Sequence, residues 1–314
     1  MLVACEEGGK TFTVTFKLLS GEPVAGLGGL QVRADDKVDV LLIALAAASG
    51  TSHWQLFFEN YELHAGEPIA GCGMADDVTV NAILTRKGGI ELAVRRLLTT
   101  ICIESLPNIV EQLVLIEVDN ASELDVLIFS MWQKMKCDPC NGKAYGHMFV
   151  ALRTHYPEFQ PEEGHQRPIT FTRILLNTVQ NEFERSMLPL SENAEEAMEQ
   201  KEYAVTIVKF IGQLFVEHLL APKVIGQVLH DLIGVRADRA DPPPECFVEC
   251  VCELLRVSGS LLDSAPMGKA LLNQVLARLV DLMRKVGPDG SIYSKRMQSE
   301  IDGILQLRSS AWAL

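Results

Sequence analysis

The chain has 314 residues, 48% of them hydrophobic and 22% charged, so it can bury a substantial core and is not a disordered tail. Its formal net charge of −13 argues against tight, sequence-independent binding to nucleic acid, which needs a basic face, but leaves room for a local basic patch. No uncharged apolar run reaches the roughly 20 residues that span a bilayer, and MLVACEEGGK is not a secretory signal, so we expect no membrane partner and reduced cysteines.

The first part of the chain has the patterns of a small mixed sheet. TFTVTFKLL alternates apolar and polar residues with the period of a half-buried strand. A glycine-rich turn, a short strand LQV and a helix over 36–49 follow, with Asp35-Asp36 as candidate caps and Gly50 as its end. WQLFF, a turn at ENYELHAGE and a last strand VTVNAIL complete the order strand, strand, helix, strand, short strand, strand.

The two halves meet in ILTRKGGIELAVRRLL, residues 83–98. Two glycines can thread a narrow protease channel, so Gly88-Gly89 is either a cleavage site or a plain linker into the next domain. We expect the linker, because a helical pattern restarts at Ile90 and cleavage requires its first turn to unfold. The bond after Gly89 is therefore predicted to stay intact.

From Gly88 onward the pattern is helical to the end of the sequence. In ITFTRILLNTVQNEFERS the apolar residues fall four apart, which places them on one helix face. Helices are predicted over 90–101, 105–118, 121–136, 142–155, 168–187, 195–218, 222–234, 244–263, 267–286 and 293–308. Paired helices that repeat every 40–47 residues or so are typical of a HEAT-type solenoid.

Five ordered stretches of this half resemble the middle domain of eukaryotic translation initiation factor 4G. They are LDVLIFSMWQKMKCDPCNGKAYGHMFVALR, ITFTRILLNTVQNEFERS, VKFIGQLFVEHLL, PECFVECVCELLRVSGSLLD and YSKRMQSEIDGILQLRSSAW. The resemblance implies an all-α HEAT-type solenoid of about five helical pairs over residues 90–314. It further implies a non-catalytic, cytoplasmic scaffold that binds and stimulates a DEAD-box RNA helicase of the initiation factor 4A class, and that contacts mRNA in some members.

Residues 10–87 look like a ubiquitin-like β-grasp domain, so the fold class is expected to be multidomain α+β. The similarity is clearest in LFFENYELHAGEPIAGCGMADDVTVNAILTRKGG, which follows the final strands of ubiquitin and its Gly-Gly tail. In this register Phe57, Asn81 and Ile83 take the places of ubiquitin's exposed patch. A ubiquitin-pathway protein could dock there, or the helical domain could cover the same residues.

The resemblance to the initiation factor also suggests a helicase-binding surface. Leu98 and Ile101 match first-helix leucines of that family, although leucines of a solenoid helix are more often core. Pro107 follows after four extra residues, Cys102 to Ser105, and Val110 replaces a phenylalanine, which puts this part in doubt. Asp138 and Pro139 match the acidic-Pro turn that ends the first repeat.

Other candidate sites have plainer explanations. Cys137-Asp138-Pro139-Cys140 is half of a zinc site, but no second CxxC pair completes it. No GxxxxGK[ST] phosphate-binding loop occurs either, so we expect no metal and no cofactor. Two local basic pairs, Arg95-Arg96 and Lys295-Arg296, are candidate RNA contacts, although the acidic net charge favours a role in surface solubility.

Two alternatives to the initiation scaffold stay open. The same solenoid could serve splicing, nonsense-mediated decay or regulation of poly(A)-binding protein, with a nuclear location for the first two. A scaffold of that branch would recover a nuclear exon-junction helicase in a pull-down and no cytoplasmic one. Alternatively, the chain could be an adaptor that works through its ubiquitin-like domain.

Overall fold

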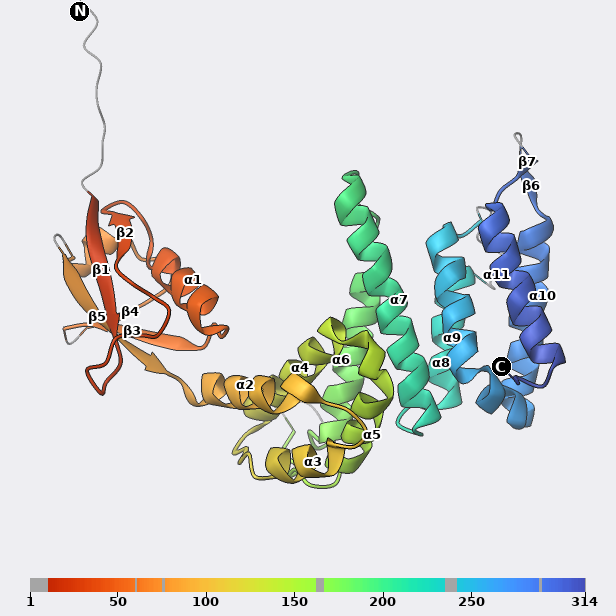
Figure 1. Ribbon diagram of the computed structural model, residues 1–314, viewed down its shortest axis with the longest axis horizontal. Coiled ribbons are helices and arrows are strands. Elements are labelled where there is room, and N and C mark those ends of the chain that lie inside the picture. The colour runs from red at the N-terminus through yellow and green to blue at the C-terminus, as the bar shows by residue number, and fades with distance from the viewer. Residues whose placement is uncertain are drawn as a thin grey trace, which may run out of the picture. The chain divides into compact units, whose positions relative to one another are not determined.

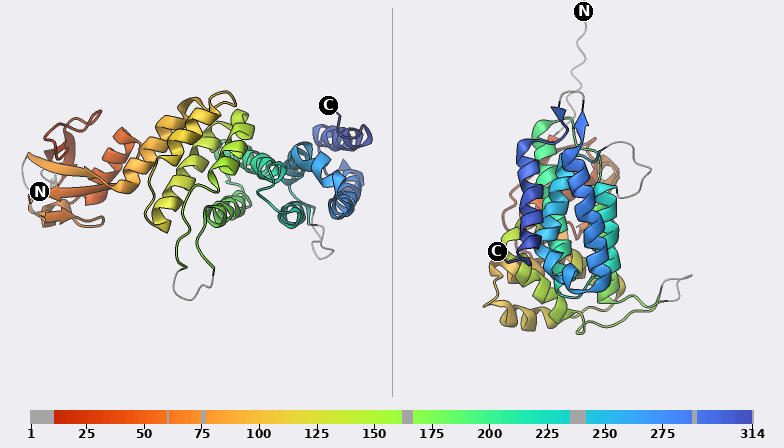
Figure 2. Two further views of the ribbon diagram at one scale, coloured as in Figure 1. Left: turned by 90° about the horizontal axis from the view of Figure 1, so that it is seen from below. Right: turned by 90° about the vertical axis from the view of Figure 1, so that its right-hand side faces the viewer.

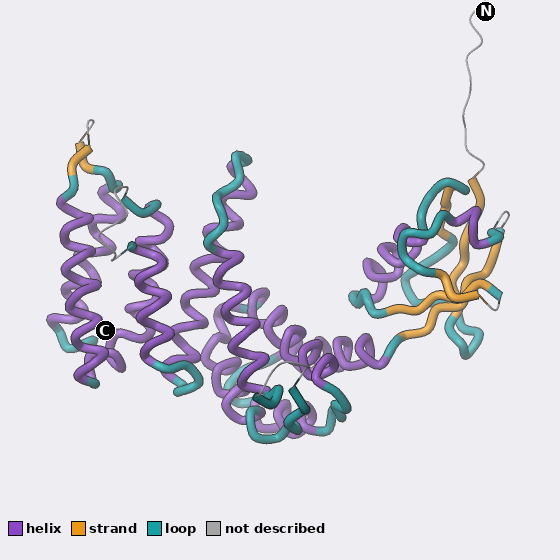
Figure 3. Tube along the Cα trace, turned by 180° about the vertical axis from the view of Figure 1, so that it is seen from behind, coloured by secondary structure: helices purple, strands orange, loops and turns teal. Residues whose placement is uncertain are grey.

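The computed structural model describes residues 11–59, 61–74, 77–161, 167–234, 242–287 and 290–313. The chain forms two compact units, Met1–Arg96 and Leu97–Leu314. The outer limits of the predicted domains, residues 10 and 314, lie outside the described residues. Figure 3 shows the two kinds of structure: the first unit combines a five-stranded sheet with helices, whereas the second is almost entirely helical.

The first unit is a five-stranded sheet with one helix against it. Its elements are β1 (Thr11–Lys17), β2 (Leu30–Arg33), α1 (Val38–Ser49), β3 (Trp54–Phe58), β4 (Tyr61–Leu63), a 3₁₀ helix (Ile69–Cys72), β5 (Val78–Leu84) and α2 (Arg86–Leu97). The strand order is β2-β1-β5-β3-β4, in which β1 and β5 are parallel and the other pairs antiparallel (Figure 1). The alternation seen in the sequence of β1 is confirmed, because Phe12, Val14 and Phe16 are buried.

Two local predictions for this unit need correction. Asp35 and Asp36 do not cap α1, whose N-cap is Lys37 without a side-chain hydrogen bond. The Asp36 carboxylate instead accepts a hydrogen bond from the Arg33 backbone N–H at 2.8 Å, so it stabilises the turn after β2. The end of α1 is as predicted, because Gly50 takes the left-handed conformation (φ 78°) that closes a helix.

The second unit is helical, as predicted. After the 3₁₀ helix η2 (Leu98–Thr100), its helices are α3 (Leu106–Val114), α4 (Ala121–Cys137), α5 (Gly142–Leu152), α6 (Phe171–Ser186), α7 (Ala194–Val216), α8 (Pro222–Ile233), α9 (Glu245–Ser264), α10 (Pro266–Arg284) and α11 (Lys295–Ser309). Side chains of Asn120, Thr170, Asn193 and Ser294 cap four of these helices by accepting backbone N–H groups. A small hairpin, β6 (Val286–Gly287) with β7 (Gly290–Ser291), was not predicted.

The helices of this unit stack in two rows. In one row α3, α5, α7, α9 and α11 each contact the next, and in the other α4 contacts α6 and α8 contacts α10. The left view of Figure 2 looks along α7 to α11, which appear end-on and stand side by side. Each helix buries an apolar face between its neighbours, which is the packing of a HEAT-like solenoid.

Candidate functional site

The predicted helicase-binding residues divide into buried and accessible ones. Leu98 and Ile101 are only 1% and 3% exposed, so they contribute to the core and cannot offer their side chains to a partner. Pro107 is exposed at the start of α3, and Val110 is half-buried one turn later. The four residues before this helix form a turn in which the Ser105 hydroxyl accepts the Cys102 backbone N–H at 3.0 Å.

The turn between α4 and α5 carries the other two predicted residues. Pro139 is exposed, and the half-buried Asp138 accepts hydrogen bonds from the Asn141 side-chain amide at 2.9 and 3.1 Å. Because α3 packs against α5, which begins right after this turn, both parts of the predicted surface flank the same helix. The cysteines on either side, Cys137 and Cys140, are exposed and free, and the residues that the structure describes contain no group of three side chains able to hold a metal.

A tyrosine packs beneath this turn. Tyr145 is fully buried, and its hydroxyl is without a hydrogen-bond partner. Burial raises the pKa of Tyr145 well above its usual value, and the charges of Asp138 and Cys137 act in the same direction. The hydroxyl therefore stays neutral, and Tyr145 acts as a packing residue that supports the turn rather than as an acid or base.

Helix α6 contains a buried carboxylate, Glu182, that was not among the predicted site residues. Glu182 accepts hydrogen bonds from the Trp132 indole N–H at 3.1 Å, from the Lys136 ammonium at 3.3 Å and from the Tyr203 hydroxyl. Burial favours its neutral form, but the hydrogen bond from Tyr203, the charge of Lys136 and the remaining hydrogen bonds outweigh burial and lower the pKa of Glu182. Its position three residues after the buried Val179 was the available signal.

These contacts make Glu182 a junction between three helices. Trp132 and Lys136 lie on α4, Glu182 on α6 and Tyr203 on α7. Lys136 also stands over the Tyr203 ring, 5.3 Å from its centroid. Through Glu182, the motif LLNTVQNEFERS thus holds the first repeats of the solenoid in register.

The predicted RNA contacts are partly engaged within the protein. Arg95 forms an ion pair with Glu91 at 3.2 Å, and Arg296 forms two 3.0 Å hydrogen bonds with the carboxylate of Glu249. Hydrogen bonds from Arg296 lower the pKa of Glu249, which favours the ionised form of this pair. All four side chains are exposed, and they differ in that Arg95 and Arg296 are paired with these carboxylates.

The three residues of the predicted ubiquitin-like patch lie on one face of the sheet. Phe57 stands opposite Asn81 in the β3–β5 ladder, and Ile83 stands opposite Gln55. Their neighbours Leu56 and Ala82 point to the other face and are fully buried. All three patch residues are half-buried, so the outer face of the sheet carries a modest apolar area.

Gly88 and Gly89, where the two halves of the sequence meet, lie inside a helix. Helix α2 begins at Arg86, so it includes Gly88 and Gly89, which were expected to form a linker before a helix that starts at residue 90. The Gly89 N–H donates to the Thr85 carbonyl at 3.0 Å, and the Thr85 N–H in turn donates to the His53 carbonyl at 3.0 Å. Glu91 on the next turn accepts a hydrogen bond from Thr51, which ties the helix to the first unit.

This geometry favours an intact bond after Gly89. A hydrolase that cuts after Gly-Gly needs an extended chain, whereas here the helix would first have to unfold. The 314-residue chain incubated with a eukaryotic extract is expected to keep its mass of 34.6 kDa. A ubiquitin fusion with an extended Gly-Gly junction serves as the positive control, and a fragment that starts at Ile90 would refute the prediction.

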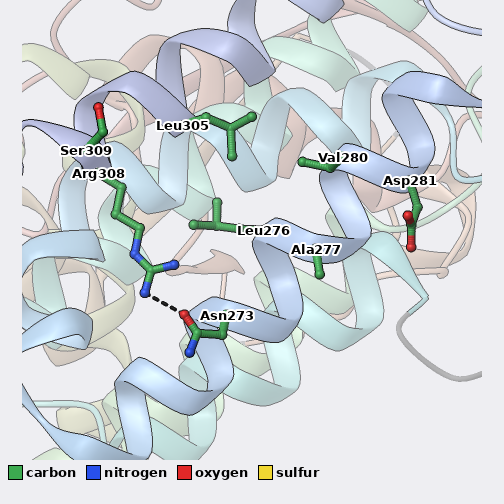
Figure 4. A pocket seen from close by; sticks show the side chains of 8 residues that line it. All are labelled: Asn273, Leu276, Ala277, Val280, Asp281, Leu305, Arg308 and Ser309. Atoms are coloured by element: carbon green, nitrogen blue, oxygen red, sulfur yellow. Dashed lines mark hydrogen bonds between the residues drawn. The ribbon is translucent and has the colours of Figure 1, made fainter.

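A hollow also lies between α10 and α11. Its volume is 570 Å³, and Leu276, Val280 and Leu305 supply its apolar wall (Figure 4). Arg308, at one end, donates to Asn273 at 2.6 Å and pairs with Asp263 at 3.3 Å, so its charge is already balanced. We assign no ligand to this hollow.

Comparison with known proteins points to one family. Residues 91–311 match the family model described as the MIF4G domain. The chain is 26% identical over 200 residues to eukaryotic translation initiation factor 4G of Arabidopsis thaliana, which covers 59% of this chain and 11% of the relative. It is 24% identical over 249 residues to human eukaryotic translation initiation factor 4 gamma 2, which covers 72% of this chain and 26% of the relative.

The chain thus spans about a tenth to a quarter of the length of these relatives. Among solved structures, the MIF4G domain of a Trypanosoma cruzi translation initiation factor matches 71% of this chain and 97% of its own, with 19% sequence identity and a TM-score of 0.43. No helix in the described part of the chain is long and apolar enough to cross a membrane.

Proposed function

Because this chain belongs to the MIF4G domain family, we propose that it is a non-catalytic translation-initiation scaffold that binds and stimulates a DEAD-box RNA helicase of the initiation factor 4A class. The observation that carries this proposal is the family match over residues 91–311. It covers nearly all of the second, helical unit, Leu97–Leu314. The two relatives named above are translation initiation factors of the 4G type. A cytoplasmic location and a domain limit of 90–314 are parts of the same proposal.

The proposed contact surface consists of the accessible residues flanking α5. Pro107 and Val110 on α3, with Asp138 and Pro139 in the α4–α5 turn, reach solvent, whereas Leu98 and Ile101 support them from the core. Only residues that lose solvent on binding can contribute directly to affinity. Substitutions at Val110 and Asp138 therefore test the surface with less risk to the fold than changes at the buried leucine and isoleucine.

The test is a binding assay between the full chain and a purified helicase of the initiation factor 4A type, with ATPase rate as a second measurement. The wild type is expected to bind and to raise the ATPase rate. The double variant Val110→Asp/Asp138→Lys is expected to bind about tenfold more weakly, which corresponds to about 1.4 kcal/mol. Met267→Asp, at a 76% exposed position on α10, is the matched control and should bind normally.

Failure of the wild type to bind or to stimulate the helicase would reject the proposal. Binding to a nuclear exon-junction helicase alone would move the chain to splicing or decay. Direct contact with mRNA is proposed at Arg96 and Lys295, and its affinity should fall modestly as salt rises, because each phosphate contact releases counterions.

A second candidate function concerns the first unit. We propose that residues 10–87 form a ubiquitin-like domain, because the strand order β2-β1-β5-β3-β4 with parallel β1 and β5 agrees with a β-grasp arrangement. Phe57, Asn81 and Ile83 would be its docking patch for a ubiquitin-pathway protein. Phe57→Ala should then lose such a partner in a quantitative pull-down while Gln55→Ala keeps it, and a Phe57→Ala protein that retains every wild-type partner would exclude the patch.

A further inference from the structure

The second row of helices is interrupted by a groove between α6 and α8. Helix α4 packs on α6 and α8 on α10, whereas α6 and α8 are separated by a hollow of 810 Å³ with Ile211 of α7 at its floor. The apolar side chains of its two walls are Leu176, Val179 and Phe183 from α6, and Leu220, Val224 and Val228 from or beside α8. Leu176 is 37% exposed, so the groove is open to solvent.

The two ends of the groove differ in charge. Each connection from α6 to α7 and from α7 to α8 reverses the chain, so α6 and α8 run the same way (Figure 1). Glu184 and Asp231 therefore lie toward one end, near the carboxyl ends of both helices, and Lys223 lies toward the other. The partial negative charge of two helix C-termini reinforces the acidic end.

The acidic end continues into the connection between α6 and α7. Met187 lines the groove and leads directly into residues 188–193, after which α7 begins. Glu192 is exposed in this connection and Glu195 is exposed in the first turn of α7, whereas Glu196 lines a separate hollow with Lys136 and Arg185. Cationic side chains are the complement of such an end, because each would gain attraction from several carboxylates.

The walls also limit the form of an occupant. Both walls are helices, whose main-chain groups bond within the helix. The rim amides are engaged as well, since Gln180 donates to Glu184 at 2.9 Å and Gln227 donates to Asp231 at 2.8 Å. An extended peptide would leave its own N–H and C=O groups unpaired against the apolar floor, whereas a helix satisfies them internally.

We propose that the α6–α8 groove binds an amphipathic helix of a partner protein, with an apolar stripe and with Lys or Arg side chains at the end that meets Glu184 and Asp231. The stripe on α6 extends from Leu176 to Met187, which is about three helical turns, so a partner helix of about three turns fills it. This site is independent of the helicase-binding surface at α3 and the α4–α5 turn.

The test uses the full chain and two synthetic helical peptides of 14 residues or so, with leucine at i, i+4, i+7 and i+11. One peptide carries lysines at one end, and the other carries glutamates in their place. The lysine peptide is expected to bind the wild type in a fluorescence anisotropy titration, and the glutamate peptide at least about tenfold more weakly. Hydrogen exchange should be slowed in residues 176–187 and 220–231.

Three variants decide between the outcomes. Leu176→Asp should weaken the lysine peptide by about tenfold or more, and Glu184→Lys should reduce or reverse the preference between the two peptides. Leu115→Asp, at a 78% exposed position beside α3, is the control and should behave as the wild type. Circular dichroism checks that all three remain folded.

The proposal is overturned if Leu176→Asp and Glu184→Lys bind both peptides as the wild type does, or if the slowed exchange falls elsewhere. Sedimentation of the free protein adds a further outcome. Self-association that Leu176→Asp abolishes would make a second copy of this chain the occupant and would likewise overturn the proposal. The Val110→Asp/Asp138→Lys variant, which is expected to lose helicase binding, should still bind the lysine peptide as the wild type does. The groove proposal and the helicase proposal can therefore be rejected independently of each other.

Discussion

Glu182→Ala is expected to lower the free energy of unfolding of the helical unit by about 3 kcal/mol, because removal of a buried acceptor leaves Lys136, the Trp132 indole N–H and the Tyr203 hydroxyl without their shared partner. Urea denaturation followed by circular dichroism at 222 nm measures this change, since most helix lies in this unit. Glu184→Ala, two residues along the same helix and exposed, should change stability by less than about 0.5 kcal/mol.

The same carboxylate predicts a pH dependence. The pKa of Glu182 is lower in the folded protein than in the unfolded chain, so its contribution is present above the unfolded value and is lost as pH falls through the folded value. Stability should therefore fall below about pH 4.5, and the fall should be smaller in Glu182→Gln, which cannot ionise. Equal stability of Glu182→Ala and Glu184→Ala at neutral pH would show that the junction between α4, α6 and α7 is unimportant.

Gly88→Val is expected to destabilise the first unit by about 2–3 kcal/mol, because helix α2 approaches the sheet too closely for a side chain. A Cβ atom at Gly88 would lie 2.5 Å from the Leu84 Cδ1 atom and 2.9 Å from the His53 carbonyl oxygen. The carbonyl already accepts the Thr85 N–H, so it cannot move without loss of that bond. Denaturation followed by hydrogen exchange within residues 77–97 measures the effect.

The neighbouring glycine provides a matched control of opposite sign. A Cβ atom at Gly89 would meet nothing within 4 Å, and Gly89 is in the same helix. Gly89→Ala should therefore stabilise the unit by about 0.5–1 kcal/mol, since alanine restricts the unfolded chain and suits a helix. If Gly88→Val and Gly89→Ala had the same small effect, the two glycines would be a linker and the helix would not be docked.

Most of the helical unit could be predicted because its signals are local. Apolar residues four apart in α6 define a buried face, and prolines or capping side chains such as Thr170 mark helix starts, so the ten predicted segments differ from the observed helices mainly at their ends. The strands of the first unit were likewise predictable, because β1 alternates apolar and polar residues.

Local sequence patterns were therefore enough to locate the helices and strands and to indicate the family that they resemble. Tertiary packing was needed to show that Leu98 and Ile101 are core, that Glu182 joins three helices, and that Gly88 and Gly89 belong to a helix. Each of these depends on residues distant in sequence: Glu182 meets Trp132, 50 positions away, and Gly88 abuts His53. Such contacts leave no local period, because they are fixed by how helices and sheet pack and not by the spacing of residues along one element.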